Sequence, residues 1–527
     1  MNPGPVIMIG LDAFDPEIAL GLAAAGELPT LAGLLESGAR CPINNPYGLM
    51  VGALWVSFAT ALKPARHGYY CWEEVDIDTY RVQPNPIPDG GYVYFWQQLA
   101  QAGLKVAAID VPHARAVPPI NGVHIAEWGA HDRHFGLHSA PVERAGNLAN
   151  AFGFHPVLGV EPFAKREFAS DDAFARSGML RTAEEEKVFA HALRKGVAMR
   201  GKMLEELMAE QDWDLFLAVF GESHASGHQQ WHLHDAKHPR FDRDVQQAVG
   251  GDPLLHVYRD IDAAVGRLLA QAPSDATIMV HLSHGMGPHY DGIHLLDEIL
   301  ARLEAHYRGG DSPDDPRNVA KRLLTRLKPG LRRIAELARV SSRLRSAVAR
   351  RMRGDLPEMR AKRAFFSEPN NFVYGGVRLN LKGREPNGVV DPADADALCD
   401  RLAADLLAIT NPDTGRPIIA SVERCDRHHA RSPGDRMPDL FLCWERHSPI
   451  EAARSPKIGT IRDPYVGWRT GDHKPDGLLV ARGPGIAPGA EFPAIDVEDL
   501  GPSAAALLGV QLEDIDGCAA AWLVSGQ

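Results

Sequence analysis

The chain has 527 residues, of which 45% are hydrophobic and 24% charged, and its formal net charge is -12. This composition is typical of a globular protein that is long enough to bury a large core. The acidic balance argues against a nucleic-acid-binding protein, because phosphate backbones select a basic surface; a small anionic substrate bound at a local positive site is compatible with it.

The first residues predict a strand rather than a targeting signal. They read MNPGPVIMIGLDAFDP, without a basic segment followed by an apolar one, so we expect no signal peptide. No window approaches about 18 uninterrupted apolar residues, so we expect no stable membrane insertion. The six cysteines form no CxxC pair, and such sparse use fits a reducing compartment. We therefore expect a cytoplasmic protein and leave homo-oligomerisation open.

Short apolar runs alternate with helical patterns along the chain. The helical patterns include residues 16–38 and 260–272. The apolar runs are continuous, which predicts strands that are buried on both faces. Strands that alternate with helices form an α/β fold with a mostly parallel central sheet sandwiched by helices. The predicted strands are residues 6–11, 106–110, 214–220, 276–282, 439–444 and 477–483.

Two segments interrupt this pattern. Residues 131–210 lack clear strands and end in a helix-rich stretch, which we interpret as a helical insertion or cap. Residues 301–363 are interpreted as a basic helical insertion, because residues 317–363 hold 16 Lys and Arg against 3 Asp and Glu. The simpler explanation is amphipathic helices with a solvated basic face; the alternative is guidance of an anionic substrate or contact with a membrane. The remaining core is discontinuous and comprises residues 1–130, 211–300 and 364–527.

Polar side chains follow several of the predicted strands. Asp12 follows the first strand, and His284 follows the strand at 276–282. His224 and His228 follow another strand, and their i, i+4 spacing puts both imidazoles on one face of a helical turn. His473 lies just before the last predicted strand. Because sites in such sheets form beyond the carboxyl ends of the strands, these positions predict a metal centre.

Four stretches carry a resemblance to a known family: GLDAFDP, LPTLAGLLESGA, WVSFATALKPARHGYY and TGDHKPDGLLVARGPGI. They are similar to motifs of the alkaline phosphatase superfamily, in particular its type I phosphodiesterase / nucleotide pyrophosphatase branch and related phosphohydrolases and phosphomutases. The resemblance covers nearly the whole chain and implies an alkaline phosphatase-like fold. It also implies two metal ions, usually zinc, and a Thr or Ser nucleophile that attacks phosphorus.

The resemblance is incomplete at three positions. The family's nucleophile position is Val51, whose isopropyl group can neither attack nor bind a metal. His224 stands where the family has the Asp of a DxxxH pair, and Ser283 stands where it has the Asp of an Asp-His pair. We therefore expect metal-activated water to replace the side-chain nucleophile.

The resemblance assigns the first metal to His224, His228 and His473. Three imidazoles with an open fourth position make a good catalytic zinc site. Asp12 and His284 are what remains of the second site, and two ligands hold a dication poorly. We expect one tightly bound Zn²⁺, with Mn²⁺ or Fe²⁺ as alternatives.

Other side chains receive supporting roles or simpler explanations. A general base or orienting group is expected among Asp12, His284 and Glu222. Ser57 and Thr60 are expected to be packed or capping hydroxyls. The remaining candidates are Asn45, Lys474 and Arg469 for contact with an anionic substrate, His289 as an alternative ligand beside Ser283, and His232 and His234 as solvated side chains.

Together these features predict a metal-dependent hydrolase of a small anionic molecule, with phosphodiesterase-like activity. Two alternatives stay open. One is hydrolysis of a non-phosphate substrate or lyase chemistry at a single three-histidine metal, and the other is an inactive binding protein of the same fold. Replacement of an Asp by another good metal ligand at His224 favours an altered enzyme over a decayed one.

Overall fold

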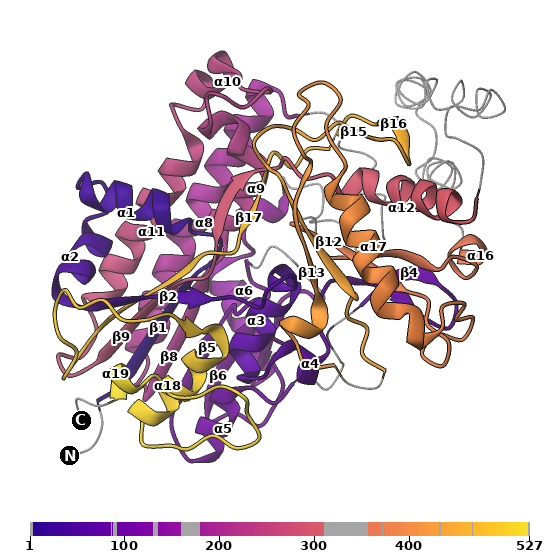
Figure 1. Cartoon of the computed structure of the whole chain (residues 1–527). Coiled ribbons are helices and arrows are strands. Elements are labelled where there is room, and N and C mark those ends of the chain that lie inside the picture. The colour runs from indigo at the N-terminus through magenta and orange to yellow at the C-terminus, as the bar shows by residue number, and fades with distance from the viewer. Residues whose placement is uncertain are drawn as a thin grey trace.

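The computed structural model describes residues 4–85, 87, 92–129, 135–159, 180–309, 357–370, 373–431, 434–465 and 467–524. A nine-stranded sheet of order β19-β2-β18-β9-β1-β8-β5-β6-β7 forms the centre of the molecule. Helices cover both of its faces, and a smaller sheet lies beside it (Figure 1). The predicted α/β architecture with a mostly parallel central sheet is confirmed.

The middle of the sheet is parallel. Strand β1 pairs with β8 on one side and with β9 on the other, so Leu11 lies level with Phe220 and Leu282. The carboxyl ends of these three strands therefore meet at one edge of the sheet, where the predicted metal ligands follow. The parallel strands are β1 (Val6–Leu11), β5 (Val106–Ile109), β6 (Gly122–Ala126), β8 (Leu215–Phe220) and β9 (Thr277–Leu282).

The margins of the sheet contain antiparallel pairs. Strand β18 (Gly477–Arg482) runs antiparallel to both β9 and β2 (Ala39–Asn44), and β19 (Ile495–Asp496) pairs with β2. At the other margin, β7 (His138–Ala140) pairs antiparallel with β6. The prediction that residues 131–210 lack a strand is therefore wrong at β7, which is too short for its residue pattern to show a period. The predicted domain boundaries stay predictions.

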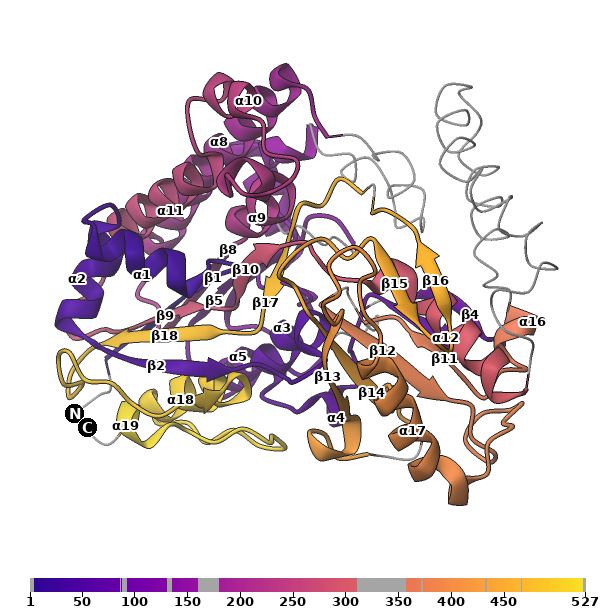
Figure 2. The same cartoon turned by 45° about the horizontal axis from the view of Figure 1, so that its top comes forward.

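Side chains of β1 alternate between two apolar clusters. Ile7 and Ile9 pack with the helices on one face, whereas Val6 and Met8 pack with those on the other. Because both faces of β1 are buried, its sequence is a continuous apolar run. Figure 2 shows the two helical layers. The first contains α1 (Pro16–Ala24), α2 (Pro29–Ser37), α8 (Ala183–Ala209) and α11 (Pro253–Leu269), and the second α3 (Met50–Thr60), α5 (Phe95–Gln101), α18 (Leu500–Leu507) and α19 (Ala521–Val524).

The helical pattern at residues 16–38 forms two helices rather than one. Gly26, between α1 and α2, adopts a φ of 78° that reverses the chain and that residues with a Cβ rarely adopt. The two helices are bent by 90° and pass a length and hydropathy test for a membrane span only as a pair; no single helix in the described ranges passes it. Similarly, α11 begins at Pro253, where Asp252 accepts hydrogen bonds from two backbone N–H groups, well before the predicted start at residue 260.

A separate four-stranded antiparallel sheet has the order β11-β12-β14-β13. Residues 439–444 form a strand as predicted, but β14 (Leu440–Trp444) belongs to this sheet and not to the parallel one. Its apolar run reflects burial on both sides, since Leu440 and Leu442 join one cluster and Phe441 another. The neighbouring elements are β11 (Phe365–Glu368), β12 (Tyr374–Leu379), β13 (Ile419–Arg424), α12 (Ile293–Tyr307) and α17 (Ala395–Leu407).

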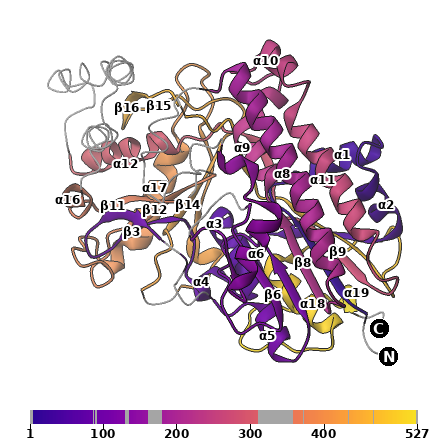
Figure 3. The same cartoon turned by 180° about the vertical axis from the view of Figure 1, so that it is seen from behind.

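Further elements complete the fold, and Figure 3 shows several of them from behind. Much of the predicted basic insertion falls at 310–356, outside the described residues. The further elements are α4 (Pro64–His67), β3 (Glu73–Asp76), β4 (Arg81–Pro84), α6 (Glu143–Phe152), α9 (Glu222–His234), α10 (Arg243–Ala248), β10 (Gly285–Pro288), α16 (Pro357–Arg360), β15 (Ala452–Ser455), β16 (Gly459–Arg462) and β17 (Gly471–Lys474).

Candidate metal centre

Three histidines predicted as ligands converge above the central sheet. His224 and His228 lie on α9, which begins where β8 ends, and His473 lies on β17. Nε2 of His224 is 2.8 Å from Nε2 of His473 and 2.9 Å from Nε2 of His228. Nitrogen ligands of a tetrahedral zinc ion at about 2.0–2.1 Å are roughly 3.3 Å apart. The rings therefore need to separate only slightly to accept an ion, and the residues fit a metal.

Burial and hydrogen bonding define the state of two of these rings. All three histidines are buried, and burial, followed by the neighbouring His284 and His224, lowers the pKa of His473 well below its usual range. The Nδ1–H of His228 donates to the carbonyl of Gly471 at 2.8 Å. That bond selects the tautomer with its lone pair on Nε2, which faces the other two rings.

Arg469 lies directly against His228. Its Nη2 is 2.7 Å from Nε2 of His228 and 3.8 Å from Oδ1 of Asp472. The same Nη2 is 3.0 Å from Nδ1 of His228, so the guanidinium lies beside the ring and not along the Nε2 lone pair. It also places a positive charge next to the centre, where an anionic group would approach.

Asp12 follows β1 and lies close to His224 and His284. Its Oδ2 is 3.6 Å from Nδ1 of His224, and its Oδ1 is 3.5 Å from Nε2 of His284. Burial alone raises the pKa of Asp12, but His224, His284 and the indole of Trp55 outweigh that effect and hold it well below its usual range. Asp12 is thus an ionised carboxylate that orients His224 from the side opposite its Nε2.

Ser283 makes hydrogen bonds to the side chain of Asp12 and to the backbone of Ala13. Its hydroxyl donates to Oδ1 of Asp12 at 3.2 Å and accepts the N–H of Ala13 at 3.1 Å. With both capacities used, Ser283 acts here as a structural connection between β9 and the turn after β1. Among the described residues, Asp12 and His284 belong to neither of the two groups of three converging His, Cys, Asp or Glu donors.

Glu222 has partners other than the three histidines, which corrects its predicted role in proton transfer. Its Oε1 accepts hydrogen bonds from Arg200 at 2.8 Å and from His155 at 3.0 Å. Arg200 also contacts Asp110 at 2.7 Å, so Glu222 belongs to a buried ionic cluster. Although burial raises its pKa, Arg200 and His155 lower it to about 2. A carboxylate held in this way is a poor acceptor of a proton at neutral pH.

The two predicted substrate-contacting residues are engaged in structural bonds. Nζ of Lys474 is 2.7 Å from Oδ2 of the fully buried Asp15. The amide nitrogen of Asn45 donates to the carbonyls of Ser283 and Pro475, at 2.9 and 2.8 Å. Neither contact supports a direct substrate role, and sequence reasoning missed Asp15, which accepts bonds from the backbone of α1 and β10.

The hydroxyl and histidine side chains that were expected to have simpler roles also have partners in the structure. Ser57 contacts Nε2 of His67, and Thr60 donates to Val56 within α3, so both are packed hydroxyls as expected. His232 was expected to be solvated but is buried beside Thr470, and burial lowers its pKa to about 3. His234 pairs with Asp252.

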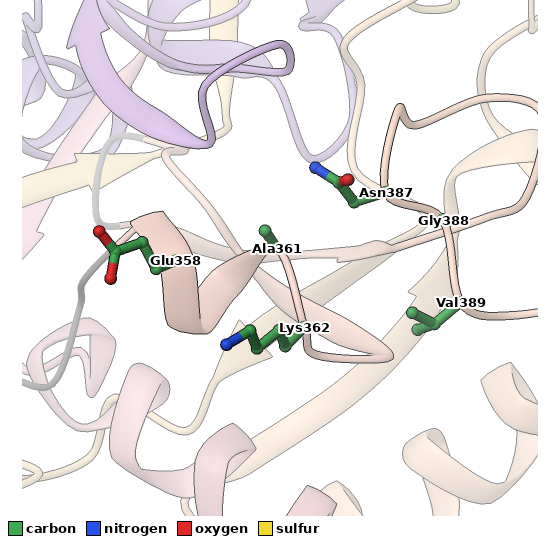
Figure 4. Close-up of a pocket in the computed structure, with 6 residues that line it drawn as sticks. All are labelled: Glu358, Ala361, Lys362, Asn387, Gly388 and Val389. Carbon is green, nitrogen blue, oxygen red and sulfur yellow. The ribbon is translucent and has the colours of Figure 1, made fainter.

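One surface cavity, of about 640 Å³, lies apart from the histidines. Figure 4 shows that α16 and the loop after β12 line it, and none of the predicted site residues takes part. Its six lining residues are Glu358, Ala361, Lys362, Asn387, Gly388 and Val389.

Comparison with known proteins identifies the family of the chain. A family model described as type I phosphodiesterase / nucleotide pyrophosphatase matches residues 6–476. The chain belongs to the type I phosphodiesterase / nucleotide pyrophosphatase family. This family is hydrolytic, and the match confirms the resemblance drawn from the motifs. A search of curated proteins finds no match.

A search of solved structures finds matches at low sequence identity. Phosphonoacetate hydrolase from Sinorhizobium meliloti 1021 is 14% identical with a TM-score of 0.50, and 96% of each chain is covered. Human ectonucleotide pyrophosphatase / phosphodiesterase 5 is 12% identical with a TM-score of 0.47, covering 99% of this chain and 98% of its own. The murine counterpart is 12% identical with a TM-score of 0.47 and covers 97% of both chains.

Proposed function

We propose that this chain is a metal-dependent hydrolase of small anionic substrates, chiefly phosphodiesters, in which water rather than a side chain attacks. The observation that carries the proposal is the convergence of three buried imidazoles, with His224 Nε2 2.8 Å from His473 Nε2 and 2.9 Å from His228 Nε2. Membership of a phosphodiesterase family supports the substrate class.

His224, His228 and His473 would hold the ion, for which we propose Zn²⁺. A zinc ion held by three neutral ligands supplies a Lewis acid and lowers the pKa of a coordinated water toward neutrality. The protein contributes the orientation of the ligands: Asp12 positions His224, and the Gly471 carbonyl positions His228.

Arg469 is proposed to bind the anionic group of the substrate. It is the guanidinium in contact with the His228 ring, and a phosphodiester carries one negative charge that a fork of N–H donors matches well. An anionic substrate paired with Arg469 would offset the repulsion between this guanidinium and the ion. Substrate binding and metal binding would then reinforce each other.

The absence of a hydroxyl at residue 51 excludes a covalent intermediate at that position. Val51 lies in the first turn of α3, at the position that the resemblance assigns to the nucleophile. His284 flanks the centre and would accept the proton of the attacking water, and Asp12, 3.5 Å from its Nε2, would orient that imidazole.

The test is hydrolysis of bis(4-nitrophenyl) phosphate by protein reconstituted with zinc or manganese, alongside 4-nitrophenyl acetate as a carboxyl ester. We expect metal-dependent turnover of the diester, and no phosphorylated protein by intact mass spectrometry after rapid quenching. Bound metal with cleavage of the acetate alone would favour the non-phosphate alternative. A chain that binds no metal at all would contradict the proposal and favour an inactive binding protein.

A further inference from the structure

A second group of metal-binding side chains lies next to the three histidines. In the described ranges, two groups of three donor residues have their ligand atoms within 4.8 Å of one another, and the second consists of His289, Asp291 and Asp472. His289 and Asp291 follow β10, while Asp472 lies on β17, which is paired with β10. Asp472 precedes His473, so successive residues of one strand contribute to different groups, as the alternation of side chains predicts.

The two carboxylates are oriented toward His289 by the backbone. Oδ1 of Asp291 accepts the N–H of Ile293 at 3.0 Å, and Oδ1 of Asp472 accepts the N–H of His473 at 2.9 Å. The other oxygen of each carboxylate is left for the shared centre. Oδ2 of Asp291 is 2.6 Å, and Oδ2 of Asp472 is 3.8 Å, from Nε2 of His289.

Burial makes the negative charges of Asp291 and Asp472 energetically unfavourable unless they are compensated. Asp472 is 0% exposed, Asp291 4% and His289 7%, and Oδ2 of Asp472 has no hydrogen-bond partner among the described residues. Two buried carboxylates carry two negative charges, of which a protonated imidazole would cancel only one. Buried charges are tolerated when they are paired or coordinate a metal. The metal-free alternative is a protonated His289 together with Arg469, which lies 3.8 Å from Oδ1 of Asp472.

We propose that His289, Asp291 and Asp472 bind a second divalent cation, separate from the three-histidine centre. One imidazole and two carboxylates form a mixed nitrogen and oxygen ligand set, which suits Mn²⁺ or Zn²⁺. This ion has a structural role: it ties the chain after β10 to β17. Because Oδ1 of Asp472 is also 3.5 Å from Nδ1 of His473, the same ion fixes a carboxylate that supports a ligand of the first centre. The inference does not depend on the proposed function.

The test is the metal content of the purified full-length chain after saturation with Mn²⁺ or Zn²⁺ and removal of loosely bound ions. We expect two ions per chain in the wild type and one in Asp291→Asn, which keeps the oxygen that caps Ile293. His224→Ala, which alters only the first centre, should also lose one ion.

Asp252→Asn is the matched control. Asp252 likewise caps a helix with Oδ1 and contacts a histidine with Oδ2, at 2.7 Å from His234, but it has no second carboxylate in its group. It should keep both ions. A wild type with one ion that is lost in His224→Ala and kept in Asp291→Asn would overturn the inference and leave the proposed function intact.

Anomalous diffraction from wild-type crystals provides a measurement that does not depend on how the variants fold. A peak at the metal absorption edge between His289, Asp291 and Asp472 supports the second ion. A peak at the three histidines with none between these residues overturns it.

Discussion

The hydroxyl of Ser283 connects two turns of the chain by donating to Oδ1 of Asp12 at 3.2 Å and accepting the N–H of Ala13 at 3.1 Å. Ala13 has a φ of 53°, a left-handed conformation that costs free energy for a residue with a Cβ. The serine that replaces an expected carboxylate therefore stabilises the turn that presents Asp12.

Ser283→Ala should lower stability because it leaves the buried N–H of Ala13 without its acceptor. The expected cost is about 1–3 kcal/mol, which is the usual penalty for an unsatisfied buried polar group. The thermal midpoint of the metal-free protein measures it. Ser37→Ala serves as control, because the Ser37 hydroxyl lies at the surface and donates to the carbonyl of Gly33 within its own helix. Equal midpoints for Ser283→Ala and the wild type would show that Ser283 does not support the turn.

His224→Ala should abolish metal binding at the first centre and reduce hydrolysis by at least about 100-fold, because the remaining two imidazoles form an incomplete ligand set. Metal analysis and diester turnover measure the two effects. His234→Ala is the matched control, since His234 lies on the same helix and contacts Asp252 instead of the centre. Retention of full activity in His224→Ala would refute the assigned centre.

Arg469→Gln should change two properties in opposite directions. Loss of the guanidinium beside His228 should tighten zinc binding, as measured by competition with a chromophoric chelator. The loss of a charge-assisted contact worth about 1.5–3 kcal/mol should raise KM for the diester roughly 10- to 100-fold. Arg469→Lys should recover part of the KM effect because it keeps the charge. An unchanged KM in Arg469→Gln would remove Arg469 from the substrate site.

Val51→Thr should change kcat by less than about threefold, which corresponds to under 1 kcal/mol of barrier. The physical reason is that water already supplies the attacking oxygen in the proposed reaction. Steady-state kinetics with bis(4-nitrophenyl) phosphate, and quenched intact-mass spectra, measure the outcome. A large gain in rate together with a phosphorylated variant would mean that the side-chain route has been restored.

Glu368 should make stability depend on pH. Burial raises its pKa to about 7, against the opposing effects of Arg378 and the Val75 N–H. The folded chain therefore holds a proton that the unfolded chain releases from about pH 4.5 upward, so this contribution to stability is present below that pH and is lost as the pH rises to about 7. Its total is on the order of 2–3 kcal/mol.

Glu368→Gln, which keeps an acceptor for Val75, removes this dependence. The thermal midpoint of the variant relative to the wild type should rise between pH 4.5 and 7.5. Glu143→Gln, at an exposed position, should show no such rise. A constant difference between variant and wild type across that range would contradict the assignment.

The sequence predicted the central strands because both of their faces are buried, so that β1, β8 and β9 read as uninterrupted apolar runs. The same signal misplaced residues 439–444, because a strand of an antiparallel sheet that is covered on both sides gives the same run. It also missed β7, whose three residues are too few to show a period.

For the site, the order of residues along the chain was sufficient to predict which histidines meet. His224 and His228 follow the carboxyl end of β8. His473 lies on β17 just before β18, which runs antiparallel to β9 and therefore begins at the same edge of the sheet. The partners of individual polar atoms were not predictable in this way. Glu222 precedes His224 by two residues, yet it bonds to Arg200 from a distant helix.

By itself, the sequence determined the family, the layered fold and the identity of the converging histidines, because these follow from periodic burial and from motifs read along the chain. Only the tertiary structure decided that Ser283 supports a strained turn, that Lys474 is neutralised by Asp15, and that Asp472 meets His289 and Asp291. These outcomes depend on contacts between segments that are remote in sequence. A buried charge selects whichever partner the packed chain brings within reach, and no local pattern encodes that choice.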